Sequence, residues 1–242
     1  MRVLYIRPVA DSGQAAEMEA VLKRAARRGT TVTVRSLPPD RPRHLEYHAY
    51  EAIAVADIVR IVRTGRDDHD AIVLGGFYDM GLRAAREVSG TAVVTAPCES
   101  STAIARALGQ RFSILVGRRK WIPKMSDLVR GYGHGNAMAS MRAIGLGVEA
   151  IRADPELAHA RLRDEARRAI EEDGAEVLIL GCTAKHGFHE ELTRELGAPV
   201  IDSMIAALKY AEMLAGTWSP SRLGGSEPPP EAEIESWGLF RK

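Results

Sequence analysis

Short apolar runs alternate along the chain with longer segments in which apolar residues recur at helical spacing. Each run is followed by turn or polar residues. Parallel strands joined by crossover helices produce this alternation, so the pattern predicts an α/β fold. We expect about eight strands, over Val3–Ile6, Thr31–Val34, Ala71–Leu74, Ala92–Thr95, Phe112–Val116, Ala143–Leu146, Val177–Leu180 and Val200–Ile201.

Two of the intervening segments have a clear helical pattern. Asp154–Asp173 begins with an Asp-Pro pair, places Leu162 and Ala169 on one face and stops before Gly174. These are start and stop signals of an amphipathic helix. Tyr50–Arg63 shows less regular spacing, but most of its charged residues still fall on one side, and we expect a second helix there.

The region Arg118–Asn136 lacks such a pattern because a basic run, a proline and three glycines interrupt it. We expect an irregular loop with a short helix near Met125–Tyr132. The basic run Arg118-Arg119-Lys120-Trp121 resembles a small nucleic-acid patch. We interpret it instead as a mobile rim or a subunit contact, because the net charge of the whole chain is close to zero.

Composition limits the possible partners. Lysine and arginine number 33 and aspartate and glutamate 32, which gives a formal charge of +1. A chain with so small a net charge has no strong positive electrostatic field, so nucleic acid and anionic membranes are not expected as partners. The sequence contains no run of about 18 apolar residues, so we expect no membrane-spanning helix. The first residues do not resemble a signal peptide, so we expect a soluble, cytoplasmic protein.

Two stretches of the chain are copies of one another. Asp70–Gly76 matches the sequence pattern of Glu176–Cys182, with Gly76 aligned on Cys182. The match continues through a helix into a second strand that follows Gly90 in one copy and Gly197 in the other. Each copy therefore predicts a strand, a tight turn, a helix and a strand.

The duplication predicts two similar Rossmann-like lobes, each with a mostly parallel sheet of about four strands. We expect a pseudo-twofold axis between them, with the site between the lobes. Residues 1–97 and 203–216 would form lobe 1, residues 98–202 lobe 2, and residues 217–242 a C-terminal tail. The tail is rich in proline and serine and ends in Trp237–Phe240, which we expect to dock on this subunit or a neighbour in a homo-oligomer.

Ligands of open parallel sheets bind at the carboxyl ends of strands, near helix N-termini. Gly76 and Cys182 occupy that place in the two copies. We expect them to meet across one cleft, where backbone N–H groups would hold a small anion. The predicted donors are those of Phe77, Tyr78, Thr183 and Ala184.

Cys98 and Cys182 are the only cysteines, too few for a disulfide framework, so each is interpreted as a thiol. Cys182 is the predicted proton donor or base, because a helix N-terminus stabilises a thiolate and lowers the pKa of a thiol below its free value of about 8.5. Cys98 lies beside Glu99 at the end of the fourth strand. It is either a second catalytic thiol or a packed small residue.

Other polar residues near strand ends admit a functional and a structural interpretation. Tyr78 could donate a hydrogen bond to an enolate or pack as an ordinary wall residue. Arg7 could pair with a substrate carboxylate or lie on the surface. Glu99 and Asp202 could orient a cysteine, bind a substrate amide or cap helices.

Two histidines follow Cys182. His186 and His189 could be imagined as a metal pair, but the remaining ligands of such a site are not evident. A solvated helix face is the simpler interpretation, and no metal is expected.

The motif Leu180-Gly181-Cys182-Thr183, followed by Leu196–Asp202, is similar to the second-cysteine motif and closing strand of the aspartate/glutamate/hydantoin racemase superfamily. The resemblance covers most of residues 1 to 216, and hydantoin racemases are the most similar members. Supporting matches are Phe77, Asp79, Gly81, Leu82, Glu99, Leu108–Ser113 and Arg167–Ile170.

The resemblance implies a cofactor-independent enzyme in which two cysteines flank an acidic carbon. One thiolate removes the proton and the opposite thiol returns one. Gly76 stands where the family has its first cysteine. Arg7-Pro8-Val9 replaces the usual Asn-Pro-Asn, and Gly117-Arg118 replaces a threonine pair, so the substrate contacts differ.

The resulting hypothesis is a racemase or isomerase that moves a proton next to a carboxylate or a cyclic-amide carbonyl, with a small anionic or cyclic-amide substrate. A single thiol opposite Gly76 resembles the arrangement in arylmalonate decarboxylase, so decarboxylation is an alternative, as is cis-trans isomerisation through a covalent Cys182 adduct. Two further alternatives are a hydrolase of hydantoin-like rings with Cys182 as nucleophile and a non-catalytic protein that binds small anions.

Overall fold

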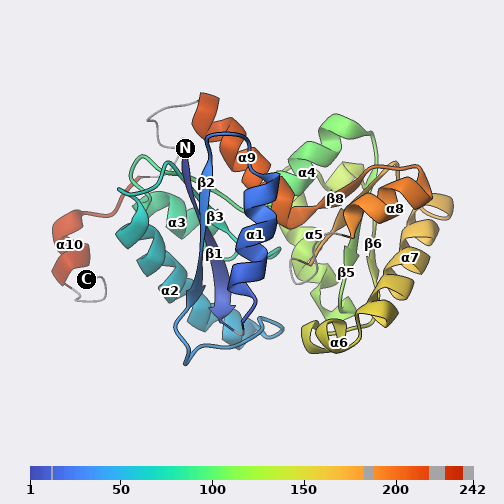
Figure 1. Cartoon of the computed structure of the whole chain (residues 1–242), viewed down its shortest axis with the longest axis horizontal. Coiled ribbons are helices and arrows are strands. Elements are labelled where there is room, and N and C mark those ends of the chain that lie inside the picture. Colours follow the sequence, from blue (N-terminus) through green and yellow to red (C-terminus); the bar gives the residue numbers. More distant parts are fainter. Residues whose placement is uncertain (12, 183–187, 218–226, 237–242) are drawn as a thin grey trace. The chain divides into compact units, whose positions relative to one another are not determined.

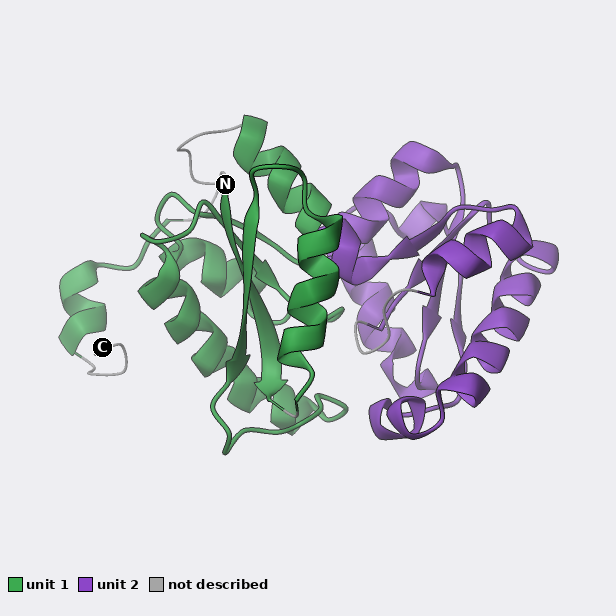
Figure 2. Cartoon of the chain, viewed as in Figure 1, with its two compact units in different colours: residues 1–96, 208–242 green, residues 97–207 purple. Residues whose placement is uncertain are grey.

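The chain folds into two compact units in a computed structural model that describes residues 1–11, 13–182, 188–217 and 227–236 (Figure 2). Unit 1 comprises Met1–Ala96 and Leu208–Lys242, and unit 2 comprises Pro97–Ala207. No helix in the described ranges combines the length and the apolar character needed to cross a membrane.

Unit 1 contains a four-stranded parallel sheet in the order β2-β1-β3-β4 (Figure 1). The helix α2 contacts β1, β2 and α3, and α1 contacts β2. All residues of β3 are buried, as is typical of parallel strands with both faces covered. The elements of this unit are β1 (Arg2–Ala10), α1 (Ala15–Ala25), β2 (Thr31–Leu37), α2 (His48–Gly65), β3 (Ala71–Leu74), α3 (Leu82–Val88), β4 (Val93–Thr95), most of α9 (Ser203–Thr217) and α10 (Glu231–Ser236).

Unit 2 repeats this topology in a second parallel sheet, in the order β6-β5-β7-β8. The two four-stranded sheets confirm the α/β class and the predicted pair of similar sheets. The elements of this unit are α4 (Pro97–Leu108), β5 (Phe112–Val116), η1 (Arg119–Trp121), α5 (Ile122–Gly131), η2 (Gly135–Ala137), β6 (Met138–Ala143), α6 (Val148–Ala153), α7 (Pro155–Glu171), β7 (Val177–Leu180), α8 (His189–Leu196) and β8 (Val200–Asp202).

A glycine follows the equivalent strands β3 and β7 for the same steric reason. Gly75 N–H donates to the carbonyl of Ile6 at 2.7 Å, and Gly181 N–H donates to that of Leu115 at 2.8 Å. A Cβ atom at Gly75 would lie 2.7 Å from the same Ile6 oxygen, and one at Gly181 would lie 3.1 Å from the Leu115 oxygen. Only glycine lets the chain pass so close to the central strand.

Five predicted strands have different bounds in the structure, and the differences are largest for β1 and β6. β1 continues past Pro8 to Ala10, with an irregularity in its pairing with β2 after Arg7. Its pairing with β3 ends at Ile6. Pro8 has no N–H group and lies beyond this pairing, so the β1–β3 ladder loses no hydrogen bond to it. The strand predicted over Ala143–Leu146 is wrong, because β6 covers Met138–Ala143. β6 is an edge strand whose residues are all half-buried, so its apolar signal is weak.

The helix predictions hold with small shifts. α7 is capped by Asp154, whose Oδ1 accepts from Leu157 N–H at 3.0 Å, and α2 extends the predicted Tyr50–Arg63 helix at both ends. The region predicted as an irregular loop is more ordered than expected, since η1, α5 and η2 follow one another. Trp121 is buried there, with Lys120 Nζ 5.2 Å from its ring centroid, whereas Arg119 and Lys120 are exposed.

The described part of the C-terminal tail packs on unit 1. Ile234 of α10 is buried, and Glu231 forms ion pairs with Arg63 at 2.6 Å and Arg66 at 3.1 Å. The predicted docking of Trp237–Phe240 falls outside the described residues.

Candidate active site

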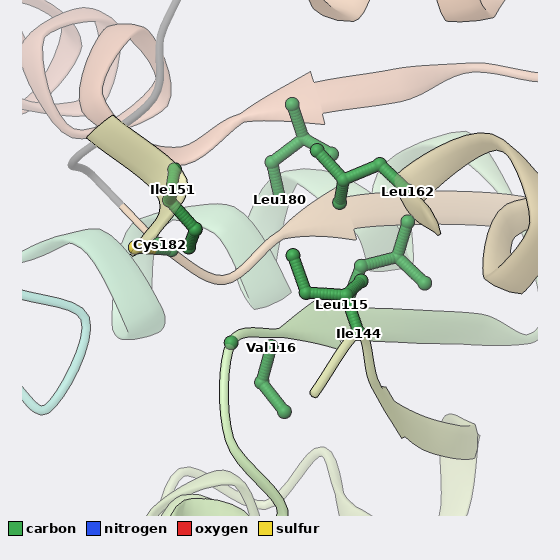
Figure 3. A pocket seen from close by; sticks show the side chains of 8 residues that line it. Leu115, Val116, Ile144, Ile151, Leu162, Leu180 and Cys182 are labelled. Carbon is green, nitrogen blue, oxygen red and sulfur yellow. The ribbon is translucent and has the colours of Figure 1, made fainter. Parts of the chain in front are cut away.

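Cys182 follows β7 directly after Gly181 and is half-buried in unit 2. It lies against one end of the apolar core of this unit and lines a narrow pocket (Figure 3). The cavity volume is about 20 Å³, enough for one water-sized group. The other lining residues are Leu115, Val116, Gly117, Ile144, Ile151, Leu162 and Leu180.

The pocket is built from elements far apart in the sequence. β5 and β7 supply its floor, Ile144 comes from the segment after β6, Ile151 from α6 and Leu162 from α7. Because every lining side chain is apolar or a thiol, the pocket can exclude water from the sulfur and accept a small apolar group. Sequence periodicity does not predict the contact with Ile151, because α6 is too short to show a helical pattern.

Asp202 and His189 lie beside this strand end. Asp202 ends β8 and pairs in register with Leu180, two residues before Cys182. Its Oδ1 accepts from the N–H groups of Met204 and Ile205 at 2.9 and 3.2 Å, which caps α9. Its Oδ2 lies 3.8 Å from Nδ1 of His189.

This position of His189 corrects the sequence interpretation of a solvated helix face. Its side chain is only 22% exposed. The helix α8 begins at His189. Thr183, Ala184 and His186 lie outside the described residues.

Gly76 occupies the equivalent strand end in unit 1. A Cβ atom at this position would lie 2.5 Å from Cε of Met80 and 3.3 Å from Cγ of Pro8. Both neighbours are side chains, and the Met80 methyl is the flexible end of one. The side chain of Met80 therefore fills the space that a larger residue at position 76 would need, a contact that the sequence analysis missed.

The turn after Gly76 is tightly held. Asp79 N–H donates to the Gly76 carbonyl at 2.9 Å, and Asp79 adopts a left-handed φ of 48° while 5% exposed. Phe77 is buried and Tyr78 is half-buried. The predicted roles of Phe77 and Tyr78 in binding an anion or enolate stay predictions.

Arg7 is buried, and its guanidinium group binds other residues of the chain. It is 3% exposed, and its Nη1 donates to the Ala10 carbonyl at 2.8 Å while Nη2 donates to Gln14 Oε1 at 3.0 Å. Asp11 lies 3.6 Å from Nη1. The guanidinium thus holds the turn between β1 and α1, which argues against the predicted contact with a substrate carboxylate.

Cys98 and Glu99 lie in the first turn of α4, after β4 has ended at Thr95. Cys98 is 0% exposed, which favours the packed role that the sequence left open. Glu99 is half-buried and near His134. Burial lowers the pKa of the His134 imidazole, Arg106 lowers it further, and Glu99 opposes both.

Metal ligands are not clustered in the parts of the chain that the structure describes. No group of three or more histidine, cysteine, aspartate or glutamate side chains there could hold a metal ion. The contact between His189 and Asp202 supplies two such groups and is better suited to proton chemistry than to holding a metal.

Comparison with known proteins supplies the chemical context. The family model for Asp/Glu/hydantoin racemases matches residues 5–211. A hydantoin racemase from Pseudomonas sp. (strain NS671) is 34% identical over 215 residues, which cover 88% of this chain and 86% of that protein.

Solved structures show the same fold. An allantoin racemase from Klebsiella pneumoniae has a TM-score of 0.88 and 31% identity, over 96% of this chain and 94% of that one. A crystal structure of arylmalonate decarboxylase has a TM-score of 0.59 and 24% identity, over 95% and 96% of the two chains. At that identity the second likeness concerns the fold alone.

Proposed function

Because the chain belongs to the Asp/Glu/hydantoin racemase family, we propose that it racemises a substituted hydantoin or a related cyclic amide by proton transfer at Cys182. The observation that carries this proposal is the half-buried thiol at the end of β7, next to a narrow apolar pocket. The family supplies the reaction type, and this thiol supplies a group able to perform it.

The proposed step needs one acidic carbon next to a carbonyl. The Cys182 thiolate takes the proton from that carbon, and the C–H electron pair moves into the carbonyl to form an enolate. A water molecule delivers a proton to the opposite face, which restores the carbon with inverted configuration, and the hydroxide that remains takes the added proton from Cys182. Backbone N–H groups could stabilise the enolate oxygen.

Two observations favour a cyclic amide over a carboxylate substrate. The relatives named above include a hydantoin racemase and an allantoin racemase, and the compounds in both names contain a hydantoin ring. In addition, Arg7, the predicted partner of a carboxylate, already binds Ala10 and Gln14. The pocket beside Cys182 suits an apolar edge of the substrate and offers no cation.

Gly76 favours a second candidate, decarboxylation of a malonate-type acid. In that reaction the C–CO2 bond breaks, its electron pair forms the enolate, and one S–H group is sufficient to protonate the carbon. Cys182 would regain its proton from water. The glycine at the first-cysteine position is the observation that supports this alternative.

Incubation in deuterated water separates these reactions. We expect an optically pure 5-benzylhydantoin to lose its rotation and to gain deuterium at the carbon that bears the benzyl group. Carbon dioxide released from an arylmalonate would favour decarboxylation, and a ring-opened product would favour hydrolysis. Binding without turnover would favour the anion-binding alternative.

The variants Cys182→Ala and Cys98→Ala locate the chemistry. Cys182→Ala should lose the activity, whereas Cys98→Ala should keep most of it because Cys98 is fully buried. Full activity in Cys182→Ala would contradict the proposal, and loss in both variants would favour a two-thiol mechanism.

A further inference from the structure

The contact between His189 and Asp202 has no role in the chemistry described so far. The side chain of Asp202 is 3% exposed, and one of its oxygens caps α9 through two backbone N–H groups. The other oxygen lies 3.8 Å from Nδ1 of His189. That gap exceeds a hydrogen bond of about 3 Å by less than 1 Å, so a small shift of the ring closes it.

Nδ1 of His189 is shielded from solvent and has no hydrogen-bond partner among the described residues. A buried imidazole nitrogen normally has such a partner. The adjacent carboxylate is the group best suited to it, since a carboxylate oxygen can accept a hydrogen bond from a protonated ring nitrogen and fix the orientation of the ring.

The sheet register brings this contact near the thiol. Asp202 lies opposite Leu180, and Cys182 is two residues further along. Ideal strand geometry, with strands about 4.8 Å apart and a rise of about 3.3 Å per residue, would place the Cα atoms of Asp202 and Cys182 about 8 Å apart if the chain continues extended past Leu180. A histidine side chain held at Asp202 is therefore close enough to act on the sulfur electrostatically.

We propose that His189, held by Asp202, is a positioning residue that stabilises the thiolate of Cys182. The thiol proton moves to the imidazole, which leaves a thiolate and an imidazolium without changing the total charge. Asp202 stabilises the imidazolium, and His189 does not touch the substrate. This inference rests on the proposed function of Cys182 and assigns the group that keeps its sulfur reactive.

The other charged groups near His189 do not supply this role. Glu190 and Glu191 follow it on α8, and Arg163 of α7 forms an ion pair with Glu191 at 2.6 Å. His159 of α7 stacks on Phe188 at a centroid distance of 3.8 Å. In the described part of the chain, the pair of His189 and Asp202 joins α8 to the end of β8, whereas the pair of Arg163 and Glu191 joins α8 to α7.

The chain offers a matched control at another helix start. His48 is the first residue of α2, as His189 is of α8, and its Nδ1 lies 3.7 Å from Glu51 Oε2. Its side chain is 66% exposed, and it belongs to unit 1. His48→Gln therefore removes a histidine–carboxylate contact at a helix start without changing any residue of β7, α8 or β8.

The test measures alkylation of Cys182 by iodoacetamide against pH, with the Cys182 peptide quantified by mass spectrometry in the full chain. In His189→Gln the midpoint of the reactivity curve should rise by about one pH unit, toward the value of a free thiol near 8.5. His48→Gln should leave it unchanged. Asp202→Asn, which keeps an oxygen to cap α9, should shift it in the same direction as His189→Gln.

An unchanged midpoint in His189→Gln, an equal shift in His48→Gln, or a lower midpoint in Asp202→Asn would overturn the inference. If His189→Gln does not fold, Asp202→Asn decides. Turnover of 5-benzylhydantoin is measured separately, with kcat expected to fall about tenfold in His189→Gln while KM changes less than about twofold. Alkylation does not depend on turnover, so failure of the proposed substrate and failure of the histidine inference give different results.

Discussion

After β3 the chain runs through Gly75 to Gly76, and after β7 it runs through Gly181 to Cys182. Both glycines donate the same hydrogen bond to the central strand of their sheet. The next residue differs: Met80 packs over Gly76, whereas Cys182 carries a thiol beside an apolar pocket. The duplicated backbone is the same in both units, but only one of them places a reactive group at this point.

The steric limits at these positions explain the difference. A side chain at Gly75 or Gly181 would press on backbone oxygen and buried side chains of the central strand. A side chain at Gly76 would meet the flexible end of Met80 first. The first glycine of each copy is thus required by the fold, while the following residue can vary with the chemistry.

The largest effect is expected from Gly75→Ala, which should lower the free energy of unfolding by about 3 kcal/mol. The new Cβ would lie 2.3 Å from Cε1 of Tyr5, whose ring is fully buried. Gly76→Ala, which displaces the flexible end of Met80 and presses lightly on Pro8, should cost less than about 1 kcal/mol. Urea unfolding followed by circular dichroism measures both, and equal losses would contradict the distinction.

The comparison extends to the edge strands. Arg142 of β6 lies opposite Leu115, and Arg35 of β2 lies opposite Ile6, so the two arginines are equivalent in the repeat. Arg142 donates to Asp173 at 2.5 Å, and its other contacts are Glu172 and Glu165 at 2.7 and 3.3 Å. Arg35 is exposed.

Replacing the two arginines should therefore have unequal effects. Arg142→Met leaves three carboxylates close together and should lower the free energy of unfolding by about 2 kcal/mol. Arg35→Met should change it by less than about 0.5 kcal/mol. Similar urea midpoints for the two variants would contradict this prediction, because they would mean that Arg142 of β6 and Arg35 of β2 contribute equally to stability.

A smaller effect is expected at the strand ends themselves. The family resemblance implies a second thiol at position 76, and Met80→Ala would clear space for it. Gly76→Cys combined with Met80→Ala should raise the racemisation rate about tenfold over Met80→Ala alone, because a second acid can return the proton. Polarimetry measures the rate, and no gain would indicate that position 76 takes no part in proton return.

The smallest expected effect is the acid dependence of stability in unit 2. The hydrogen bond from Arg142 holds the pKa of Asp173 below its usual 3.8. The folded state binds this proton more weakly than the unfolded state, so the stabilisation is complete above that value and is lost as pH falls through the lowered pKa. Arg142→Met should reduce the loss of stability below pH about 4, and identical acid slopes would contradict this.

The sequence predicted the parts of the fold with the strongest local signal. β3, β5 and β7 have the predicted bounds because every residue in them is buried and the apolar runs are continuous. β6 was misplaced because Ile144 and Leu146, which follow it, are buried in the core although they lie outside the strand.

The candidate site was only partly predictable for a similar reason. The repeat identified Cys182, since it compares residues at a fixed offset along the chain. The contacts of Arg7 with Ala10 and Gln14 and of His189 with Asp202 depend on how a turn folds back or how two strands pair. Residue type and spacing do not specify such contacts, so Arg7 was assigned to the substrate and His189 to solvent.

The central claim, that Cys182 moves the substrate proton, is tested most directly by exchange in deuterated water. The rate of deuterium incorporation at the benzyl-bearing carbon of 5-benzylhydantoin, above the enzyme-free rate, is compared between the native chain and Cys182→Ala by proton NMR. We predict measurable enzymatic exchange in the native chain and none in Cys182→Ala. Equal exchange in the two proteins would contradict the assignment of Cys182.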